Sequence, residues 1–260
     1  MEIEKKAIRL GAVAAGISSI ESLVENNAVD LNILPSAKTI LVIACGHSRA
    51  ALDSKNLQVK QYDTIATYEK VRTVCKELVT ILERQGYEAV AIPAYIPLDM
   101  SDGKYGMVGS VDLRRAAVEA GIGSYGKSGL LLVKGFGPRV RVGAVLTSAP
   151  LRRAKKKSKS LCPSECRICM LGCPSKALLG GGKVDKRACG RVIFEFGLRR
   201  MMKFAGEMFD ASPEERADLL KSYPFRELWQ TLVSGSYYYC FECQALCPIG
   251  KEKRLRRSIS

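Results

Sequence analysis

Eight of the ten cysteines lie in the second half of the chain, and their spacing could hold iron–sulfur clusters. The segment CPSECRICMLGCP begins at Cys162 and the segment CFECQALCP begins at Cys240. Both leave two or three residues between successive cysteines and end in Cys-Pro, and in two-cluster ferredoxins the cysteine before proline ligates the other cluster. This rule predicts one [4Fe–4S] cluster on Cys162, Cys166, Cys169 and Cys247. It predicts a second on Cys173, Cys240 and Cys243, with Cys189 as the fourth ligand.

Two other kinds of metal site use similar cysteine spacings. Zinc could take the same thiols in pairs, but the interleaved motifs and the Cys-Pro endings favour iron. The spacing from Cys162 to Cys169 also occurs in radical-SAM enzymes, whose cluster needs an iron with an open position. Because Cys247 supplies a fourth thiolate, the sequence disfavours that chemistry. A disulfide framework is not expected either, because the N-terminus does not read as an export signal.

The glycine-rich segment GIGSYGKSG, residues 121–129, matches two nucleotide-binding motifs letter for letter. It satisfies both the phosphate-binding loop and the dinucleotide fingerprint. A phosphate loop follows a strand and opens a helix, so that the helix N-terminus faces the phosphates. Here the order is reversed, because residues 112–120 predict a helix and residues 129–134 predict a strand. We therefore expect these glycines to end a helix and to allow a close backbone approach.

Hydrophobic periodicity in the first 150 residues predicts an α/β layer. Residues 38–44, 88–97 and 140–147 are expected strands, and residues 68–85 are an expected helix. Cys75 falls on the apolar face of that helix and is expected to be a core thiol. Cys45 and His47 follow the end of a strand, where open α/β sheets bind ligands, although a lone histidine is more often a polar loop residue.

The shift in cysteine content and a basic stretch at residues 152–159 divide the chain. We expect an α/β cofactor or substrate domain at residues 1–150 and a cysteine-rich domain at residues 151–260. The second domain contains a helical insertion at about residues 190–233, in which Ser212 and Glu215 form the pattern of a capping box. The insertion is expected either to cover the second cluster or to provide a docking face for a partner.

The chain has 260 residues and a formal net charge of +15. Such an excess suits an anionic partner, either a phosphorylated cofactor, RNA or an acidic redox protein, or it is a solvated surface. The basic runs interleave no aromatic residues of the kind that stack on bases. The sequence contains no apolar run long enough to cross a membrane, and we expect a cytoplasmic protein.

The ordered motifs resemble those of the epoxyqueuosine reductase and reductive dehalogenase superfamily. The resemblance is carried by AGIGSYGKSGLLL, GPRVRVGAVLTSAPL, DKRAC and YCFECQALCP, and spans about residues 37–250. It implies an α/β domain of the nitroreductase-like type that binds cobalamin, and a ferredoxin-like domain whose two [4Fe–4S] clusters pass electrons to it. It also implies that the glycine-rich turn lies near the corrinoid.

The resemblance suggests where the cofactor and the acid would lie. The expected cofactor-binding residues are Gly123, Tyr125, Gly126, Lys127 and Ser128, with Arg139 and Arg141 as anion contacts. The aspartate that is thought to protonate the substrate in epoxyqueuosine reductases falls on Met107 here. The remaining candidate acids are Asp102, Asp112 and Tyr125.

The sequence therefore predicts an iron–sulfur oxidoreductase, similar to epoxyqueuosine reductase, that passes electrons from a soluble low-potential donor to a cofactor in the first domain. Cobalamin is the expected cofactor, and the substrate is a small molecule or a nucleoside-type compound. The main alternative is a non-catalytic electron carrier or reductive activator of a partner corrinoid enzyme. A third interpretation, RNA binding with structural clusters, rests on charge alone.

Overall fold

The computed structural model describes residues 2–101, 109–152 and 159–251. Its main sheet has four strands in the order β1-β2-β6-β3, formed by Ala14–Ser19, Thr39–Gly46, Val140–Thr147 and Ala89–Ile92. Neighbouring strands are antiparallel, and the long central pair aligns Thr39 with Thr147 and Gly46 with Val140. The apolar runs of β2 and β6 suit central strands that are covered on both faces.

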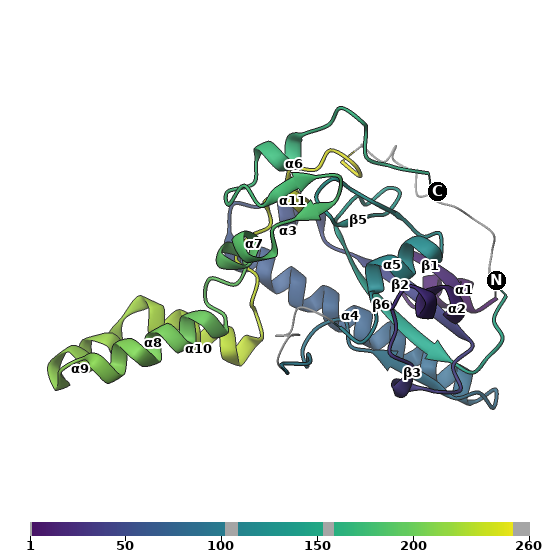
Figure 1. Ribbon diagram of the computed structural model, residues 1–260, viewed down its shortest axis with the longest axis horizontal. Helices are drawn as coiled ribbons and strands as arrows, with labels where there is room; N and C mark the ends of the chain where they lie inside the picture. Colours follow the sequence, from purple (N-terminus) through teal and green to yellow (C-terminus); the bar gives the residue numbers. More distant parts are fainter. Residues whose placement is uncertain (1, 102–108, 153–158, 252–260) are drawn as a thin grey trace, which may run out of the picture.

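Helices cover both faces of this sheet (Figure 1). On one face, α4 (Leu57–Glu83) and α1 (Glu2–Arg9) pack against Leu41, Ile43 and Cys45 of β2. On the other face, α5 (Leu113–Glu119) and α2 (Ile20–Glu25) pack against the alternate residues of the same strand. The alternation follows from the two-residue repeat of a strand. The predicted mixed α/β arrangement of the first part is observed.

The predicted helix at residues 68–85 is confirmed but begins earlier, because Asn56 caps it with a hydrogen bond from the amide of Val59. Asp112 caps α5 through the amide of Arg115 at 3.1 Å. Gly121 follows that helix with a φ of 73°. The left-handed region is open to glycine at little cost, so this glycine ends the helix as expected.

Small elements, three of which contain a cysteine, surround one end of the sheet. They are β4 (Ser124–Tyr125), β5 (Leu131–Leu132), α3 (Arg49–Asp53), α6 (Ile168–Leu171), β7 (Leu178–Gly180), β8 (Lys183–Val184), α7 (Lys186–Ile193) and α11 (Glu242–Ala245). A 3-10 turn at Leu31–Ile33 precedes the start of β2. The chain reaches α11 after the insertion and returns beside α3 and α6 (Figure 1).

Three helices of the insertion project from this end as a helical arm, formed by α8 (Leu198–Asp210), α9 (Pro213–Lys221) and α10 (Tyr223–Ser234) (Figure 1). Phe196, Phe204 and Leu228 form its small core. The predicted capping box at the start of α9 is confirmed, because the Ser212 and Glu215 side chains each accept the other residue's amide hydrogen. Across the described ranges, no helix combines the length and hydropathy of a membrane span.

Candidate functional site

The first group of cysteines meets beside the glycine-rich turn. A small cavity at this point is lined by Cys162, Cys166, Cys169 and Cys247, together with Gly126, Lys127 and Ser128. The first three thiols come from the loop around α6, and Cys247 comes from the end of α11. A Cβ atom on Gly172 would overlap Leu246, so the absence of a side chain there lets the two short helices pack closely. The four thiols predicted for one cluster therefore share one cavity.

The second group gathers around Cys243. Burial and the neighbouring thiolates of Cys240, Cys189, Cys169 and Cys173 together raise the pKa of this thiol to about 12. Cys189 belongs to α7, whose first turn is capped by Asp185 through the amides of Arg187 and Ala188 at 2.9 Å. The four cysteines that the sequence assigns to the second cluster are therefore neighbours, and Cys169 of the first group is close to Cys243 as well.

The chemistry of both groups fits cubane clusters. All eight cysteines are half-buried free thiols. Among the described residues, no three side chains of Cys, His, Asp or Glu converge as the ligands of one metal ion would. The donors of a [4Fe–4S] cluster are four cysteine thiolates, so each group supplies the donor set that such a cluster needs.

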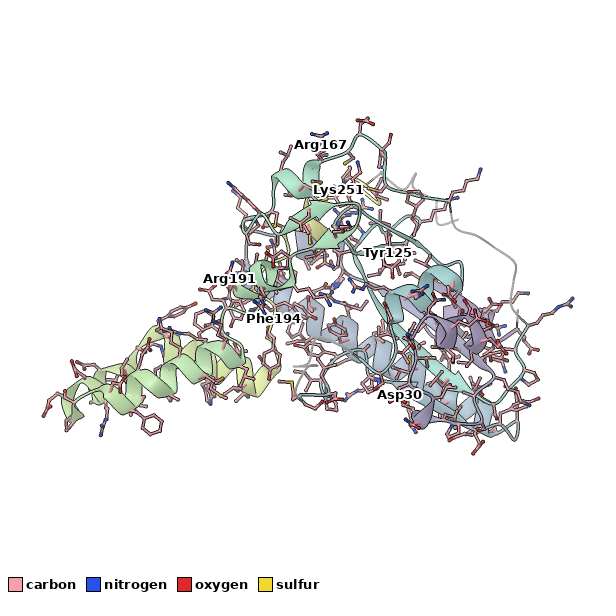
Figure 2. The ribbon with its side chains drawn as sticks, in the orientation of Figure 1. Asp30, Tyr125, Arg167, Arg191, Phe194 and Lys251 are labelled. Carbon is pink, nitrogen blue, oxygen red and sulfur yellow. The ribbon has the colours of Figure 1, made fainter. Side chains whose placement is uncertain are left out.

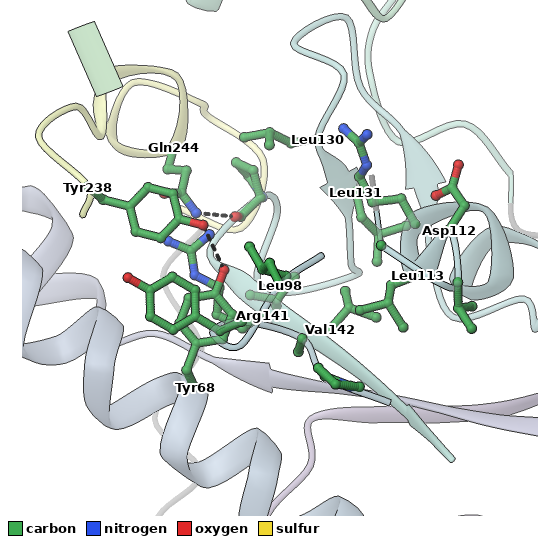
Figure 3. A pocket seen from close by; sticks show the side chains of 18 of the residues that line it. Tyr68, Leu98, Asp112, Leu113, Leu130, Leu131, Arg141, Val142, Tyr238 and Gln244 are labelled. Carbon is green, nitrogen blue, oxygen red and sulfur yellow. Dashed lines mark hydrogen bonds between the residues drawn. The ribbon is translucent and has the colours of Figure 1, made fainter. Parts of the chain in front are cut away.

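A larger cavity of about 440 Å³ lies between the sheet and the cysteine-rich segment (Figure 3). The sheet supplies residues 140–142 of β6, α4 supplies Tyr68, and the start of α5 supplies Asp112 and Arg114. The cysteine-rich segment supplies Lys186, Tyr238 and Gln244. These three residues stand close in sequence to ligands expected for the second cluster. The second cysteine group is therefore the group adjacent to this cavity.

An arginine beside two stacked tyrosine rings forms one wall of the large cavity (Figure 3). The guanidinium of Arg141 lies 4.9 Å from the ring centroids of both Tyr68 and Tyr238. The two phenol oxygens are 3.1 Å apart, and Tyr95 stacks on Tyr68 at 4.4 Å. Burial holds the pKa of Tyr68 well above its ordinary value, although the positive charge of Arg141 opposes that shift. The wall is thus a neutral aromatic surface with one fixed cation.

The expected cofactor residues separate into two places. Arg141 and Asp112 line the large cavity. Gly126, Lys127 and Ser128 lie at the first cysteine group instead. Gly123 packs against the backbone of Leu132. The side chain of Tyr125 is at the surface, with 42 % of the residue exposed (Figure 2).

Arg139 is buried, with 2 % of its surface exposed, and it lies away from the large cavity. Its guanidinium donates to the carbonyl oxygens of Ala245, Cys247 and Ile249 at 2.8–3.0 Å. Its contacts are therefore with the backbone that carries Cys247. Of the other expected residues, Asp102 and Met107 lie outside the described residues.

His47 forms a buried network at the end of β2. Its Nδ1 lies 2.6 Å from Oδ2 of Asp63 and 3.3 Å from the hydroxyl of Thr67. Burial lowers the pKa of His47, and the hydrogen bond to Asp63 opposes that shift. The other oxygen of Asp63 accepts the amide of Ser48, so the carboxylate fixes both the imidazole and the start of α3. A strand end is predicted here, but no local feature of the sequence marks Asp63.

Sequence reasoning also missed the aromatic residues of the large cavity. Tyr68 falls on the expected helix, Tyr95 on an expected strand, and Tyr238 within GSYYYC just before the second motif. The run of three tyrosines beside a cluster motif was the available signal. Phe194, which lies where the helical arm joins the remaining structure, also contacts Tyr238 at 5.9 Å between ring centroids (Figure 2).

Comparison with known proteins defines the class of this fold. No protein-family model matches the chain. An epoxyqueuosine reductase solved with a tRNA-Tyr epoxyqueuosine-modified stem loop superimposes with a TM-score of 0.61 at 17% identity, over 97% of this chain and 65% of that one. A reductive dehalogenase superimposes with a TM-score of 0.59 at 16% identity, over 90% of this chain and 36% of that one. The fold is therefore the one these two kinds of protein share.

Sequence relatives point to one of these two groups. An epoxyqueuosine reductase of Lactococcus garvieae is 30% identical over 135 residues, which are 52% of this chain and 31% of the relative. One of Bacillus cereus is 24% identical over 223 residues, 84% of this chain and 50% of the relative. The resemblance inferred from the motifs is confirmed. The chain spans about a third to a half of the length of these two relatives.

Proposed function

We propose that this protein is an iron–sulfur oxidoreductase in which two [4Fe–4S] clusters pass electrons to a cofactor, cobalamin, held in the large cavity. The observation that supports this most strongly is that the sheet and the cysteine-rich segment both contribute residues to the lining of that cavity. Tyr238 and Gln244, which line it, lie next to Cys240 and Cys243 of the second cysteine group. An electron acceptor in the cavity would adjoin the second cluster, and the first cluster would connect the second with an external donor.

The residues of the cavity fit a large cofactor of mixed polarity. Ligand sites are commonly 300–1,000 Å³, mostly apolar, with a few placed polar groups, and about 440 Å³ lies within that range. Leu98, Val111, Leu130 and Leu131 supply apolar walls, and Arg114, Arg141 and Lys186 supply positive charge. The open cavity would hold the face of a corrinoid, and the cations would bind its polar substituents or an anionic substrate.

Each group has a separate chemical task. Iron–sulfur clusters move single electrons, and cobalamin supplies a cobalt centre that delivers them to a substrate. The protein's own residues bind and orient. Arg141, which packs against two tyrosine rings, would present a positive charge to the cofactor or the substrate. Among the described residues that line the cavity, Asp112 is the acidic side chain, and it is the candidate proton donor.

The substrate class follows from the relatives and the charge. The relatives are named for the reduction of epoxyqueuosine, and one solved neighbour holds a modified tRNA stem loop. We propose a related nucleoside, presented in RNA, as the substrate of this protein. A formal net charge of +15 suits binding to RNA phosphates. A soluble low-potential protein would supply the electrons.

A carrier of electrons without its own substrate is the second candidate. It is favoured by the partial exposure of all eight thiols, because a cluster near the surface can exchange electrons with a partner protein. A carrier needs clusters near the surface but needs no corrinoid. A test of cobalamin binding therefore distinguishes the oxidoreductase from the electron carrier.

The first experiment is anaerobic reconstitution with iron and sulfide, followed by iron analysis and EPR with and without added cobalamin. About eight irons per chain and a bound cobalamin signal are expected. The variant Cys189→Ala should lose about half of the iron, whereas Cys75→Ala, a core thiol on α4, should keep it. Eight irons without cobalamin binding would favour the carrier, and four irons would contradict the assignment of Cys189.

A further inference from the structure

Lys127 connects the glycine-rich turn to the loop of the first cysteine group. Its Nζ donates to the carbonyl oxygen of Cys166 at 3.0 Å and also to that of Ser164. The residue lines the same small cavity as the four thiols of this group. Its positive charge is therefore held at the edge of the first cysteine site by two hydrogen bonds.

Arg139 places a second positive charge at the same group from a different part of the chain. Its three hydrogen bonds go to carbonyl oxygens on both sides of Cys247 and to that of Cys247 itself. Its Nε is buried and has no hydrogen-bond partner within the described part of the chain. A guanidinium 2 % exposed is weakly screened by solvent, so its charge acts strongly on its neighbours.

The second cysteine group has different surroundings. Cys173 is near the hydroxyl of Ser175 at 3.6 Å, and the cation beside Cys240 is Lys60, which extends over the ring of Phe241 at 6.0 Å from its centroid. Lys60 is half-buried, and its contact with this loop is to an aromatic ring rather than to a carbonyl oxygen. The first group thus has Lys127 bonded to one of its ligand segments and Arg139 to the other, and Arg49 also donates to the carbonyl oxygens of Gly250 and Lys251 just beyond Cys247.

We propose that Lys127 and Arg139 are positioning residues whose charges raise the reduction potential of the cluster at the first cysteine group, an inference that rests on the proposed function. Reduction adds one negative charge to a cluster, and a nearby cation stabilises the more negative state. Net charge and hydrogen bonding are the levers by which proteins set cluster potentials. The two cations would make the first cluster the better electron acceptor of an external donor.

The test is an EPR-monitored redox titration of the reconstituted protein, in which both cluster potentials are measured. Lys127→Gln and Arg139→Gln keep an N–H donor but remove the charge, and Lys127→Arg keeps the charge. Lys203→Met removes an exposed lysine from the helical arm and is the control. Each glutamine variant should lower the equilibrium constant for reduction of the same cluster about tenfold, or about 59 mV for one electron. The potentials of Lys127→Arg and Lys203→Met should match those of the unmodified protein.

Three results would overturn this inference. The glutamine variants could bind eight irons with both potentials unchanged, or they could shift different clusters. They could also fail to assemble the first cluster while Lys127→Arg assembles it, which would make Lys127 a purely structural residue. An unmodified protein with four irons or none would instead contradict the proposed function, because the clusters themselves would be missing.

Discussion

The guanidinium of Arg141 lies 4.9 Å from the ring centroid of Tyr238, and this contact joins the central sheet to the cysteine-rich segment. Arg141 belongs to β6, and Tyr238 precedes the second cluster motif by two residues. A planar guanidinium stacks on aromatic rings, whereas an ammonium is compact and strongly hydrated. The contact between Arg141 and Tyr238 therefore depends on the planar guanidinium of arginine and not on positive charge alone.

Arg141→Lys should weaken cobalamin binding while keeping the charge. Without the stacking the lysine side chain is not held in place before binding, and ordering it should cost about 0.5–1.5 kcal/mol, so the dissociation constant should rise about two- to twelvefold. An absorption titration of the reconstituted protein with cobalamin measures this. Arg199→Lys, on the helical arm, is the matched control and should bind normally. If Arg141→Lys binds cobalamin as tightly as the unmodified protein, Arg141 does not contribute to the cofactor site.

The segment that follows Cys247 packs closely against the turn between β5 and β6. Gly137 has a φ of 60°, and a Cβ atom there would overlap the carbonyl oxygen of Ile249. Gly137→Ala should displace the segment after Cys247 and lower iron content together with thermal stability. Gly135→Ala is a close control in the same turn, because it has a φ of 79° and open space around its Cβ. Both variants carry backbone strain of about 1–3 kcal/mol, so any further loss in Gly137→Ala is steric. Equal iron content and equal melting temperatures would show that the segment can move away without consequence.

Several features of the candidate site followed from local sequence. Motif spacing and the rule for the cysteine before proline grouped seven of the cysteines, and Cys189 was assigned as the remaining cysteine in that half of the chain. The order of helix and strand around GIGSYGKSG also excluded a phosphate loop, and the positive φ of Gly121 agrees with the predicted helix end.

Other features depend on contacts between distant segments. Arg139 immediately precedes β6 and Arg141 lies within it, only two residues further along the chain. They nevertheless differ in role, because the Cys247 segment covers Arg139 and leaves Arg141 at the cavity. Lys127 bonds to a loop 37–39 residues away. β1 was missed for another reason, since AAGISS has small residues and no marked alternation.

His47 should give the protein a measurable pH dependence of stability, because it is the one histidine of the chain. Burial lowers its pKa in the folded state, while the unfolded chain titrates near the ordinary value of about 6.5. Below that value the unfolded state binds the proton more readily. Stability is therefore fully present above about pH 6.5 and is lost as the pH falls toward the folded pKa, by at most about 1.4 kcal/mol per pH unit.

Denaturant unfolding between about pH 5 and 7.5 tests this, and His47→Gln should remove the part of the slope that arises from this residue. Asp63 and Arg141 are the charged groups that act on the imidazole. Asp63→Asn removes the partner that favours protonation, so it should extend the loss of stability to lower pH. An identical slope in His47→Gln would mean that the imidazole is protonated equally in both states.

The packing of α4 on β6 requires a residue without a side chain at position 143. A Cβ atom on Gly143 would overlap Cγ1 of Val71 and lie 2.9 Å from Sγ of Cys75, so Gly143→Ala should destabilise the fold by about 1–3 kcal/mol. Val71→Ala removes the obstructing methyl groups and leaves a cavity that the new methyl partly fills. Because the two residues are in direct contact, the double variant should lose less stability than the sum of the single changes. The free energies of unfolding of the unmodified protein, the two single variants and the double variant measure this coupling. If the two single effects simply add, α4 must shift to accommodate the added methyl group whatever residue stands at position 71.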